Sequence, residues 1–86
     1  MGTLNKGDKI VLKRIFNELE NSKFLSGKSV LELADNNVEL AAKICKLLKT
    51  HGMITTTEVD QQIYPILIQR SFSFPKNKQL FANIFL

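Results

Sequence analysis

Apolar side chains recur at helical spacing in the first part of the chain. Between residues 8 and 21 they share one face, which carries Val11, Leu12, Ile15, Phe16 and Leu19. Because an α-helix repeats about every 3.6 residues, this spacing predicts an amphipathic helix over 8–21. The side-chain oxygen of Asn5 or Asp8 can accept a free backbone N–H and cap the start of this helix.

A second, shorter helix is predicted to begin at Ser29. Glu32 follows three residues later, which is the spacing of a capping box, in which each side chain binds a backbone N–H. The cluster at residues 35–37, Asp-Asn-Asn, then favours a tight turn, because such side chains compete for backbone groups. Before this helix, Phe24 and Leu25 could form a very short strand.

The clearest pattern predicts a third helix from Val38 to Thr50. Its apolar face carries Leu40, Ala41, Ile44, Leu47 and Leu48. Gly52 follows at the position where a helix often ends in a left-handed residue, and Met53 can then touch Leu48, as in a Schellman motif.

The chain after Gly52 predicts a β-hairpin. Residues 54–59 are rich in Thr and β-branched side chains, residues 60–62 are polar, and residues 63–68 are apolar again. Pro65 cannot donate to a strand ladder, so we expect it to point outward or to lie at an irregularity.

The C-terminal segment is apolar, and its destination is open. Phe72 and Phe74 alternate with serines and could extend the second strand, and Pro75 allows a short helix after it. The apolar side chains either complete the core of the domain or form a two-fold interface that makes the protein a homodimer. The candidates for that interface are Phe81, Ile84, Phe85 and Leu86.

Length and composition narrow the class of protein. A chain of 86 residues with 44% hydrophobic and 23% charged residues predicts one folded domain over 1–86, with a core at 8–68 and an extension at 69–86. The net charge of +4 is a mild bias toward polyanions. No apolar run approaches the length needed to span a bilayer, so we expect no membrane partner and a place in the cytoplasm or nucleoid.

The sequence lacks the residues of a metal site or a common catalytic motif. Cys45 and His51 are the only soft ligands, and on a helix they project about 120° apart, which prevents them from sharing a metal or forming a dyad. We expect Cys45 to be a core residue. Without a phosphate loop or nucleophile motif, we expect no enzymatic activity and no cofactor.

Three helices, with a tight turn between the second and third, followed by a hairpin, are the order of a winged helix-turn-helix. The run through residues 32–34, Ile44, Leu47, Leu48 and residues 52–54 resembles that of winged-helix transcriptional regulators of bacteria, archaea and their viruses. The resemblance covers roughly residues 8–68. It implies a small α+β domain of three helices with a β-hairpin wing, followed here by a short apolar extension.

The resemblance also implies a site. In such regulators the third helix enters the major groove of double-stranded DNA, which assigns that role to the helix over 38–50. Lysines there could neutralise phosphates, while amide and carboxylate groups could read base edges. The DNA-binding candidates are Asn36, Glu39, Lys43, Lys46 and Thr50 on one side of this helix, with Arg70 beyond the hairpin. The implied function is a small regulator of transcription or replication.

An alternative interpretation uses the same fold without DNA. A lysine-rich helix face is often merely solvated, and Lys43 with Glu39 has the spacing of an ordinary i, i+4 ion pair. The helix has no arginine, and the hairpin tip at residues 60–62, Asp-Gln-Gln, is acidic where a wing that approaches phosphates would be basic. These features favour a protein-interaction module within a larger assembly.

Overall fold

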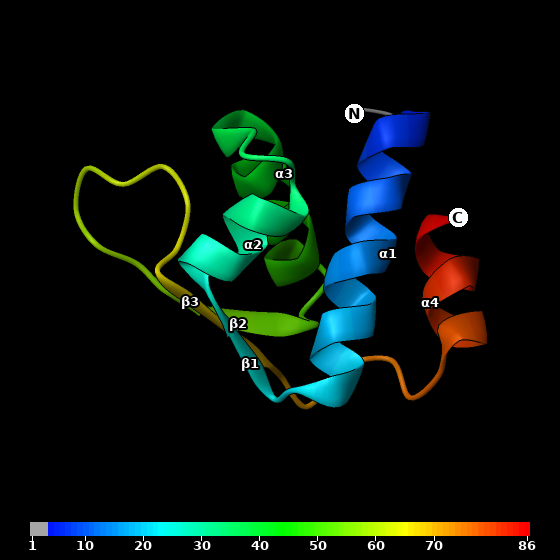
Figure 1. Cartoon of the computed structure of the whole chain (residues 1–86). Coiled ribbons are helices and arrows are strands. Elements are labelled where there is room, and N and C mark those ends of the chain that lie inside the picture. The colour runs from blue at the N-terminus through cyan, green and yellow to red at the C-terminus, as the bar shows by residue number, and fades with distance from the viewer. Residues whose placement is uncertain (1–3) are drawn as a thin grey trace.

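The computed structural model describes residues 4–86, which form four α-helices and a three-stranded antiparallel sheet. In chain order the elements are α1 (Lys6–Asn21), β1 (Phe24–Ser26), α2 (Gly27–Leu33), α3 (Val38–Thr50), β2 (Ile54–Thr57), β3 (Leu67–Arg70) and α4 (Lys78–Phe85) (Figure 1). The predicted α+β class is confirmed. The domain has a fourth helix in addition to the three expected, because the C-terminal extension folds as α4. The first three residues of the expected 1–86 domain lie outside the described residues.

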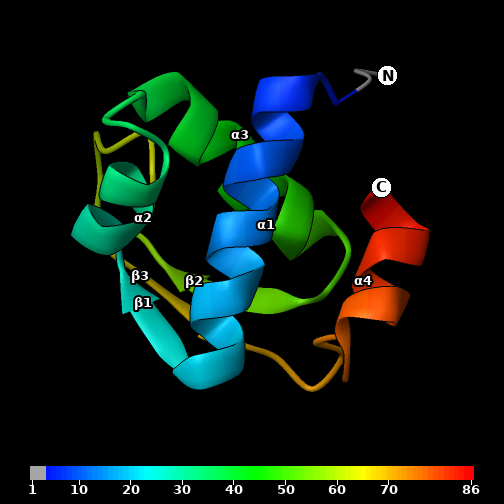
Figure 2. The same ribbon diagram turned by 45° about the vertical axis from the view of Figure 1, so that its right-hand side comes forward.

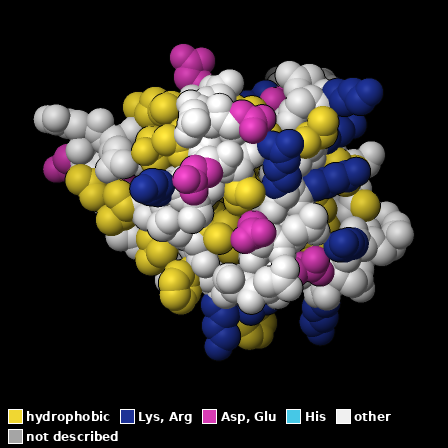
Figure 3. Space-filling model, viewed as in Figure 1, with side chains coloured by type: hydrophobic (Ala, Val, Ile, Leu, Met, Phe, Trp, Pro, Cys, Tyr) yellow, Lys and Arg dark blue, Asp and Glu magenta, His cyan; other side chains and the backbone are white. Residues whose placement is uncertain are grey.

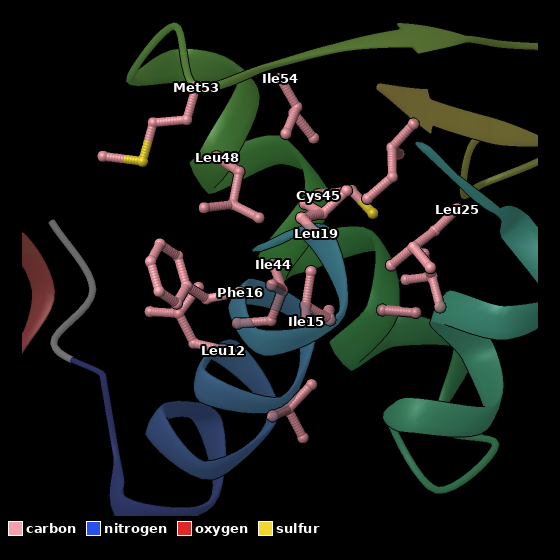
Figure 4. Packing of buried hydrophobic residues seen from close by; sticks show 14 of the residues in the cluster. Leu12, Ile15, Phe16, Leu19, Leu25, Ile44, Cys45, Leu48, Met53 and Ile54 are labelled. Atoms are coloured by element: carbon pink, nitrogen blue, oxygen red, sulfur yellow. The ribbon is translucent and has the colours of Figure 1, made fainter. Parts of the chain in front are cut away.

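The core lies between the helices and the sheet. Figures 1 and 2 show α1, α2 and α3 gathered on one side of the sheet, with α4 standing beside α1. Side chains of α1 and α3 face each other there, and residues of β1 and β2 close the space (Figure 4). The buried residues labelled in that view are Leu12, Ile15, Phe16, Leu19, Leu25, Ile44, Cys45, Leu48, Met53 and Ile54.

Asn5 caps α1, which begins at Lys6 rather than at residue 8. The Asp8 backbone N–H donates to Asn5 Oδ1 at 2.8 Å, and the Asn5 N–H donates to Asp8 Oδ2 at 3.2 Å. This is a reciprocal capping box, and it satisfies two backbone donors at the helix start. Asn5 is therefore the cap, and Asp8 is its partner.

The predicted start of α2 is wrong. Ser26 is the N-cap, and its side-chain oxygen accepts from the Ser29 backbone N–H at 3.1 Å, so Ser29 and Glu32 do not form the expected capping box. The helix begins earlier because the short strand β1 leads directly into Gly27, whose N–H donates to the Ile66 carbonyl at 2.6 Å. The very short strand expected at Phe24 and Leu25 is confirmed as β1.

The predicted bounds of α3 are confirmed, and so is its stop. Asn37 caps its start, and the chain leaves it at Gly52 with a φ of +71°. The Met53 N–H donates to the Leu48 carbonyl at 3.0 Å, and the Gly52 N–H donates to the Lys49 carbonyl at 2.9 Å. This pair of bonds is the Schellman motif.

The hairpin is present, but both strands are shorter than expected: the first begins at Ile54 as predicted and ends early, and the second begins four residues later than predicted. β3 is the central strand, and β1 and β2 pair with it on either side. β2 ends at Thr57 and β3 begins at Leu67, so residues 58–66, here called the β2–β3 loop, replace the predicted strand positions 58, 59 and 63–66. Pro65 lies near the end of this loop beside Gly27 and is buried, so it takes the irregular position that was one of the two expected and does not point outward.

The C-terminal segment turns back onto the core instead of extending β3. The strand ends at Arg70, which overturns the expected extension through residues 72 and 74. Phe74 stacks on Phe16 with ring centroids 5.2 Å apart, and Phe81 of α4 stacks on Phe16 at 4.2 Å. Phe81 is fully buried, and Phe85 is partly buried against the core. These aromatic side chains therefore help to complete the core of the domain.

Within residues 4–86, none of the helices combines the length and the apolar character that a membrane crossing needs.

Candidate nucleic-acid interface

An open groove runs between α3 and the β2–β3 loop. The loop stands out to the side of α3 in Figure 1, and the space between them has a volume of about 640 Å³. One wall is the outer face of α3, and the other is the loop together with Thr56 of β2. The lining residues are Glu39, Ala42, Lys43, Cys45, Lys46, Lys49, Thr50, Thr56, Glu58, Ile63 and Pro65.

Three lysines follow one another along the groove wall formed by α3. Lys43, Lys46 and Lys49 are three residues apart and therefore lie along one side of α3. They are exposed because the opposite, apolar face of the helix is buried against α1 and the sheet. Glu39 and Thr50 line the same groove. The structure thus brings four of the predicted residues together: Glu39, Lys43, Lys46 and Thr50.

Lys43 is bound within the protein. Its Nζ lies 2.6 Å from Asp8 Oδ2, and the Asp8 side chain is only 7% exposed. The hydrogen bond from Lys43 holds the pKa of the Asp8 carboxyl below its usual value, against the opposing effect of burial. Lys43 therefore pairs with α1 rather than with Glu39, the i, i+4 partner that the sequence offered.

Lys49 contacts the β2–β3 loop. Its Nζ lies 3.5 Å from Glu58 Oε1, and the same oxygen accepts from Thr56 Oγ1 at 3.3 Å. Both charged side chains are more than half exposed, so solvent screens this pair strongly. Among the described residues the ion pairs engage Lys43 and Lys49 but leave out Lys46. Lys46 is therefore the groove lysine whose charge is most available to a ligand.

Sequence reasoning missed Lys49 as a groove residue. The available signal was its three-residue spacing from Lys46, which continues the Lys43 to Lys46 step along one side of α3. Glu58 and Ile63 were missed as well, because their approach to α3 depends on how the β2–β3 loop folds.

Asn36 and Arg70 lie outside the groove. Asn36 is exposed in the turn before α3, with a φ of +62°. Arg70 ends β3 on the side away from the β2–β3 loop, and its guanidinium carbon lies 5.7 Å from the centroid of the Phe74 ring. With Lys23, Arg70 lines a separate hollow at that end of the sheet.

The groove offers ionic and hydrogen-bonding chemistry. Burial raises the pKa of the Cys45 thiol to about 12, so this thiol stays protonated at neutral pH. His51 lies beside Phe85, with ring centroids 4.9 Å apart. In the part of the chain that the structure describes, no three His, Cys, Asp or Glu side chains come close enough to hold a metal ion.

The β2–β3 loop is apolar and acidic. Val59, Ile63 and Ile66 are 47%, 64% and 40% exposed, and hydrophobic side chains gather over this part of the surface in Figure 3. Its charged residues are Glu58 and Asp60, with no lysine or arginine. The two walls of the groove therefore differ in charge.

Comparisons of this chain with protein-family models, with curated proteins and with solved structures find no match.

Proposed function

We propose that this chain is a winged helix-turn-helix protein that binds double-stranded DNA, with α3 in the major groove. The three helices α1, α2 and α3 followed by the β2–β3 hairpin have the order of the resemblance described above, with the β2–β3 loop as the wing. An α-helix about 10–12 Å wide fits the major groove, which is about 12 Å wide. A small regulator of transcription or replication, acting in the cytoplasm or at the nucleoid, would use the fold in this way.

The observation that carries the proposal is the exposed lysine row of α3. Lys46 has no ion-pair partner among the described residues, and the screened Lys49–Glu58 contact can be exchanged for a phosphate at small cost. Lys43 contributes less, because its ammonium already binds Asp8. We therefore assign the main phosphate contacts to Lys46 and Lys49.

The other groove residues supply base-reading groups. Glu39 lies in the first turn of α3 and can accept from a cytosine amino group, and the Thr50 hydroxyl can bind either kind of base edge. Asn36 precedes the helix and can reach an adenine edge only if the duplex extends over the turn. We expect sequence preference to depend mainly on Glu39.

A salt titration of DNA binding tests this proposal. Fluorescence anisotropy with a random duplex at several salt concentrations should give a log affinity that falls linearly with log salt. Lys46→Ala should reduce the magnitude of this slope by about 0.9, because binding then neutralises one phosphate fewer and releases one counterion fewer. Lys13→Ala is the matched control, since this exposed lysine of α1 lies beside α4, outside the groove, and its loss should leave the slope unchanged.

Two results would overturn the proposal. One is a wild-type protein with no salt-dependent affinity for duplex DNA at low ionic strength. The other is an equal effect of Lys46→Ala and Lys13→Ala, which would indicate a diffuse attraction by net charge.

A separate variant tests sequence preference. Glu39→Gln should change the discrimination between duplexes by about 1–3 kcal/mol and should leave the salt slope nearly unchanged.

The β2–β3 loop favours a second candidate, a winged helix that docks onto another protein. Exposed Ile63 and Val59 suit an apolar partner surface. The neighbouring Glu58 and Asp60 suit a basic rim around that surface, and their carboxylates repel phosphates. If this function holds, Ile63→Ser should abolish capture of the partner from a cell extract. The same variant should keep DNA affinity if the first function holds.

A further inference from the structure

A second hollow, here called the basic hollow, lies at the end of the sheet away from the β2–β3 loop. It has a volume of about 580 Å³, and its walls come from the C-terminal end of α1, the end of β3 and the segment that leads to α4. The charged and aromatic residues of its lining are Glu20, Lys23, Arg70, Phe72, Phe74 and Lys76. In Figure 3, basic side chains project from the lower edge of the molecule with a hydrophobic side chain between them, where Figure 1 places the chain that leaves β3.

The cations of the basic hollow are not neutralised within the domain. Lys23 and Lys76 are exposed and Arg70 is partly buried, and the ion pairs found among residues 4–86 include none of them. The Arg70 backbone N–H donates to the Lys23 carbonyl at 2.8 Å, which fixes these two residues side by side. Glu20 is the acidic residue of the lining. With three basic groups against one acidic group, the hollow has an excess of positive charge that is available to an anion.

An aromatic ring stands beside these charges in full contact with solvent. Phe72 is 107% exposed, and it lies in a turn that is closed by a hydrogen bond from the Phe74 N–H to the Ser71 carbonyl at 3.2 Å. Ser71 anchors this turn, since its N–H donates to the Met53 carbonyl at 2.9 Å and its hydroxyl donates to the Gly52 carbonyl. The backbone that presents the Phe72 ring to solvent is therefore held on both sides.

A second exposed ring lies at the border of the basic hollow. Phe24 is 57% exposed, it follows Lys23 along the chain, and it pairs in register with Gln69 of β3. Lys23 and Gln69 both line the hollow, and paired residues of antiparallel strands place their side chains on the same face of a sheet. Two exposed aromatic rings and three cations thus surround one recess.

We propose that the basic hollow binds single-stranded nucleic acid, with phosphates on its three cations and a base stacked on Phe72. Proteins that bind single strands combine a positively charged groove with aromatic side chains on which bases stack. The bases of a duplex already stack on one another, so the ring of Phe72 suits a strand whose bases are free. Pockets of about 300–1,000 Å³ hold drug-sized molecules, so a hollow of this volume has room for a nucleotide.

The shape of the site favours a flexible strand over a lipid surface. A bilayer is flat and would meet the Phe72 ring at the rim without filling the recess, whereas a single strand can place a phosphate in the recess and a base on the rim. Phe74 supports the recess from within, because the guanidinium carbon of Arg70 lies 5.7 Å from the centroid of its ring. Arg70 is therefore held over an aromatic face in the position from which it would meet a phosphate.

The basic hollow and the groove of α3 share no lining residue. The inference therefore does not depend on the proposed function, and a variant of either site can serve as a control for the other.

Fluorescence anisotropy with a labelled oligothymidylate of about 12 nucleotides, a length that one such binding surface can cover, tests the proposal. The log affinity of the wild-type chain should fall linearly with log salt. Lys76→Ala should reduce the magnitude of this slope by about 0.7, the contribution of one phosphate contact in a single strand. Lys46→Ala is the matched control, because it removes an exposed lysine from the groove of α3 and should leave the affinity for the single strand unchanged. An oligouridylate of the same length shows whether the strand is DNA or RNA.

Phe72→Ala separates stacking from charge. This variant should weaken oligothymidylate binding by about tenfold and should leave the salt slope unchanged, because loss of a stacked base alters no phosphate contact. The circular dichroism spectrum should stay that of the wild type, since the ring is fully exposed. Ile63→Ala is the control for loss of an exposed apolar side chain, and it should bind as the wild type does. Glu20→Gln should strengthen binding, because it removes the acidic group of the lining.

Three results would overturn the proposal. The first is a wild-type chain with no salt-dependent affinity for either oligonucleotide at low ionic strength. The second is equal weakening by Lys46→Ala and Lys76→Ala, which would indicate the groove of α3 or a diffuse attraction by net charge. The third is a chain that binds neither oligonucleotide and co-sediments with phosphatidylglycerol–phosphatidylcholine vesicles through Phe72, which would assign the hollow to a lipid surface.

Discussion

The β2–β3 loop lies at one end of the hairpin, and the C-terminal segment leaves the hairpin at the other end, after Arg70. The two segments differ in how far their apolar side chains are buried. Both are rich in apolar residues, and both follow a short strand of the same sheet. The C-terminal segment folds back and places Phe74 and Phe81 against Phe16 of α1. The β2–β3 loop stands away from the core, and its Ile63 remains 64% exposed.

The difference comes from the partners that each segment finds. Phe16 offers an aromatic face that two rings can stack on, and burial of these rings offsets part of the entropy cost of ordering the segment. The β2–β3 loop faces the exposed lysine side of α3 across an open groove, and its Ile63 stays largely in solvent. Apolar content alone therefore does not decide burial, since a matching face must also be within reach.

Removing the central ring of the C-terminal segment should have the largest effect. Phe81→Ala deletes a fully buried side chain that stacks on Phe16, and we expect a loss of about 3–5 kcal/mol of stability. Urea denaturation measures it. A loss below about 1 kcal/mol would mean that α4 is peripheral, as the β2–β3 loop is.

The base of the β2–β3 loop should be the next most sensitive position. A Cβ on Gly27 would overlap the Pro65 carbonyl oxygen and lie 3.0 Å from the Ile66 Cα, so backbone must move. We expect Gly27→Ala to cost about 1–3 kcal/mol. Thermal unfolding measures the cost, and an unchanged midpoint would show that the loop is not held against α2.

The Asp8–Lys43 pair joins α1, on which the C-terminal segment packs, to α3, which the β2–β3 loop faces. Asp8→Asn should cost about 1–2 kcal/mol at pH 7, because Lys43 then loses a nearly buried partner. The pair lowers the pKa of Asp8, so its contribution is present above the ordinary carboxyl value of 3.8 and is lost as the pH falls through the lower folded value. The stability gap between wild type and Asp8→Asn should therefore close below about pH 4.

Chemical denaturation of both proteins between pH 7 and pH 2 measures this gap. A gap that stays constant through that range would mean that ionisation of the Asp8 carboxyl does not contribute to stability, either through Lys43 or through the Asn5 N–H that it also accepts.

Gly52 controls how the chain passes from α3 into β2. Its φ is +71° and a Cβ there would meet nothing within 4 Å, so Gly52→Ala should cost only the backbone strain, about 1 kcal/mol. The melting midpoint measures it. A midpoint equal to or above that of the wild type would contradict the left-handed stop.

The smallest effect is expected in the β2–β3 loop itself. Ile63→Ala removes an exposed side chain, and we expect a change within about 0.5 kcal/mol by the same urea titration. The difference in unfolding free energy between Ile63→Ala and Phe81→Ala measures the contrast between the two segments directly. A larger loss at Ile63 would show that the loop packs on the domain in solution.

Several features were predictable because their signals lie within a few residues. The bounds of α3 follow from its apolar periodicity, and its end follows from Gly52 and Met53, whose hydrogen bonds reach back only to the last turn. Of the five residues predicted to share one side of α3, Glu39, Lys43, Lys46 and Thr50 line the groove, because helical geometry alone places them together, whereas Asn36 lies in the turn before the helix and does not.

Other features required contacts between distant parts of the chain. Ser29 had the correct local spacing for a cap, yet α2 begins at Gly27 because β1 pairs with β3, which lies about 40 residues later in the sequence. The second strand of the hairpin was placed too early because the chain around Pro65 lies against Gly27 instead of pairing with β2, and no local pattern encodes that approach.

The sequence by itself determined the amphipathic helices, the left-handed stop at Gly52 and the lysine face of α3, because side-chain periodicity and capping act over one or two turns. Only the tertiary structure decided that Lys43 binds Asp8 and that Phe81 stacks on Phe16. Those contacts join α1 to later elements, and which partner each side chain takes depends on how the helices pack around one core.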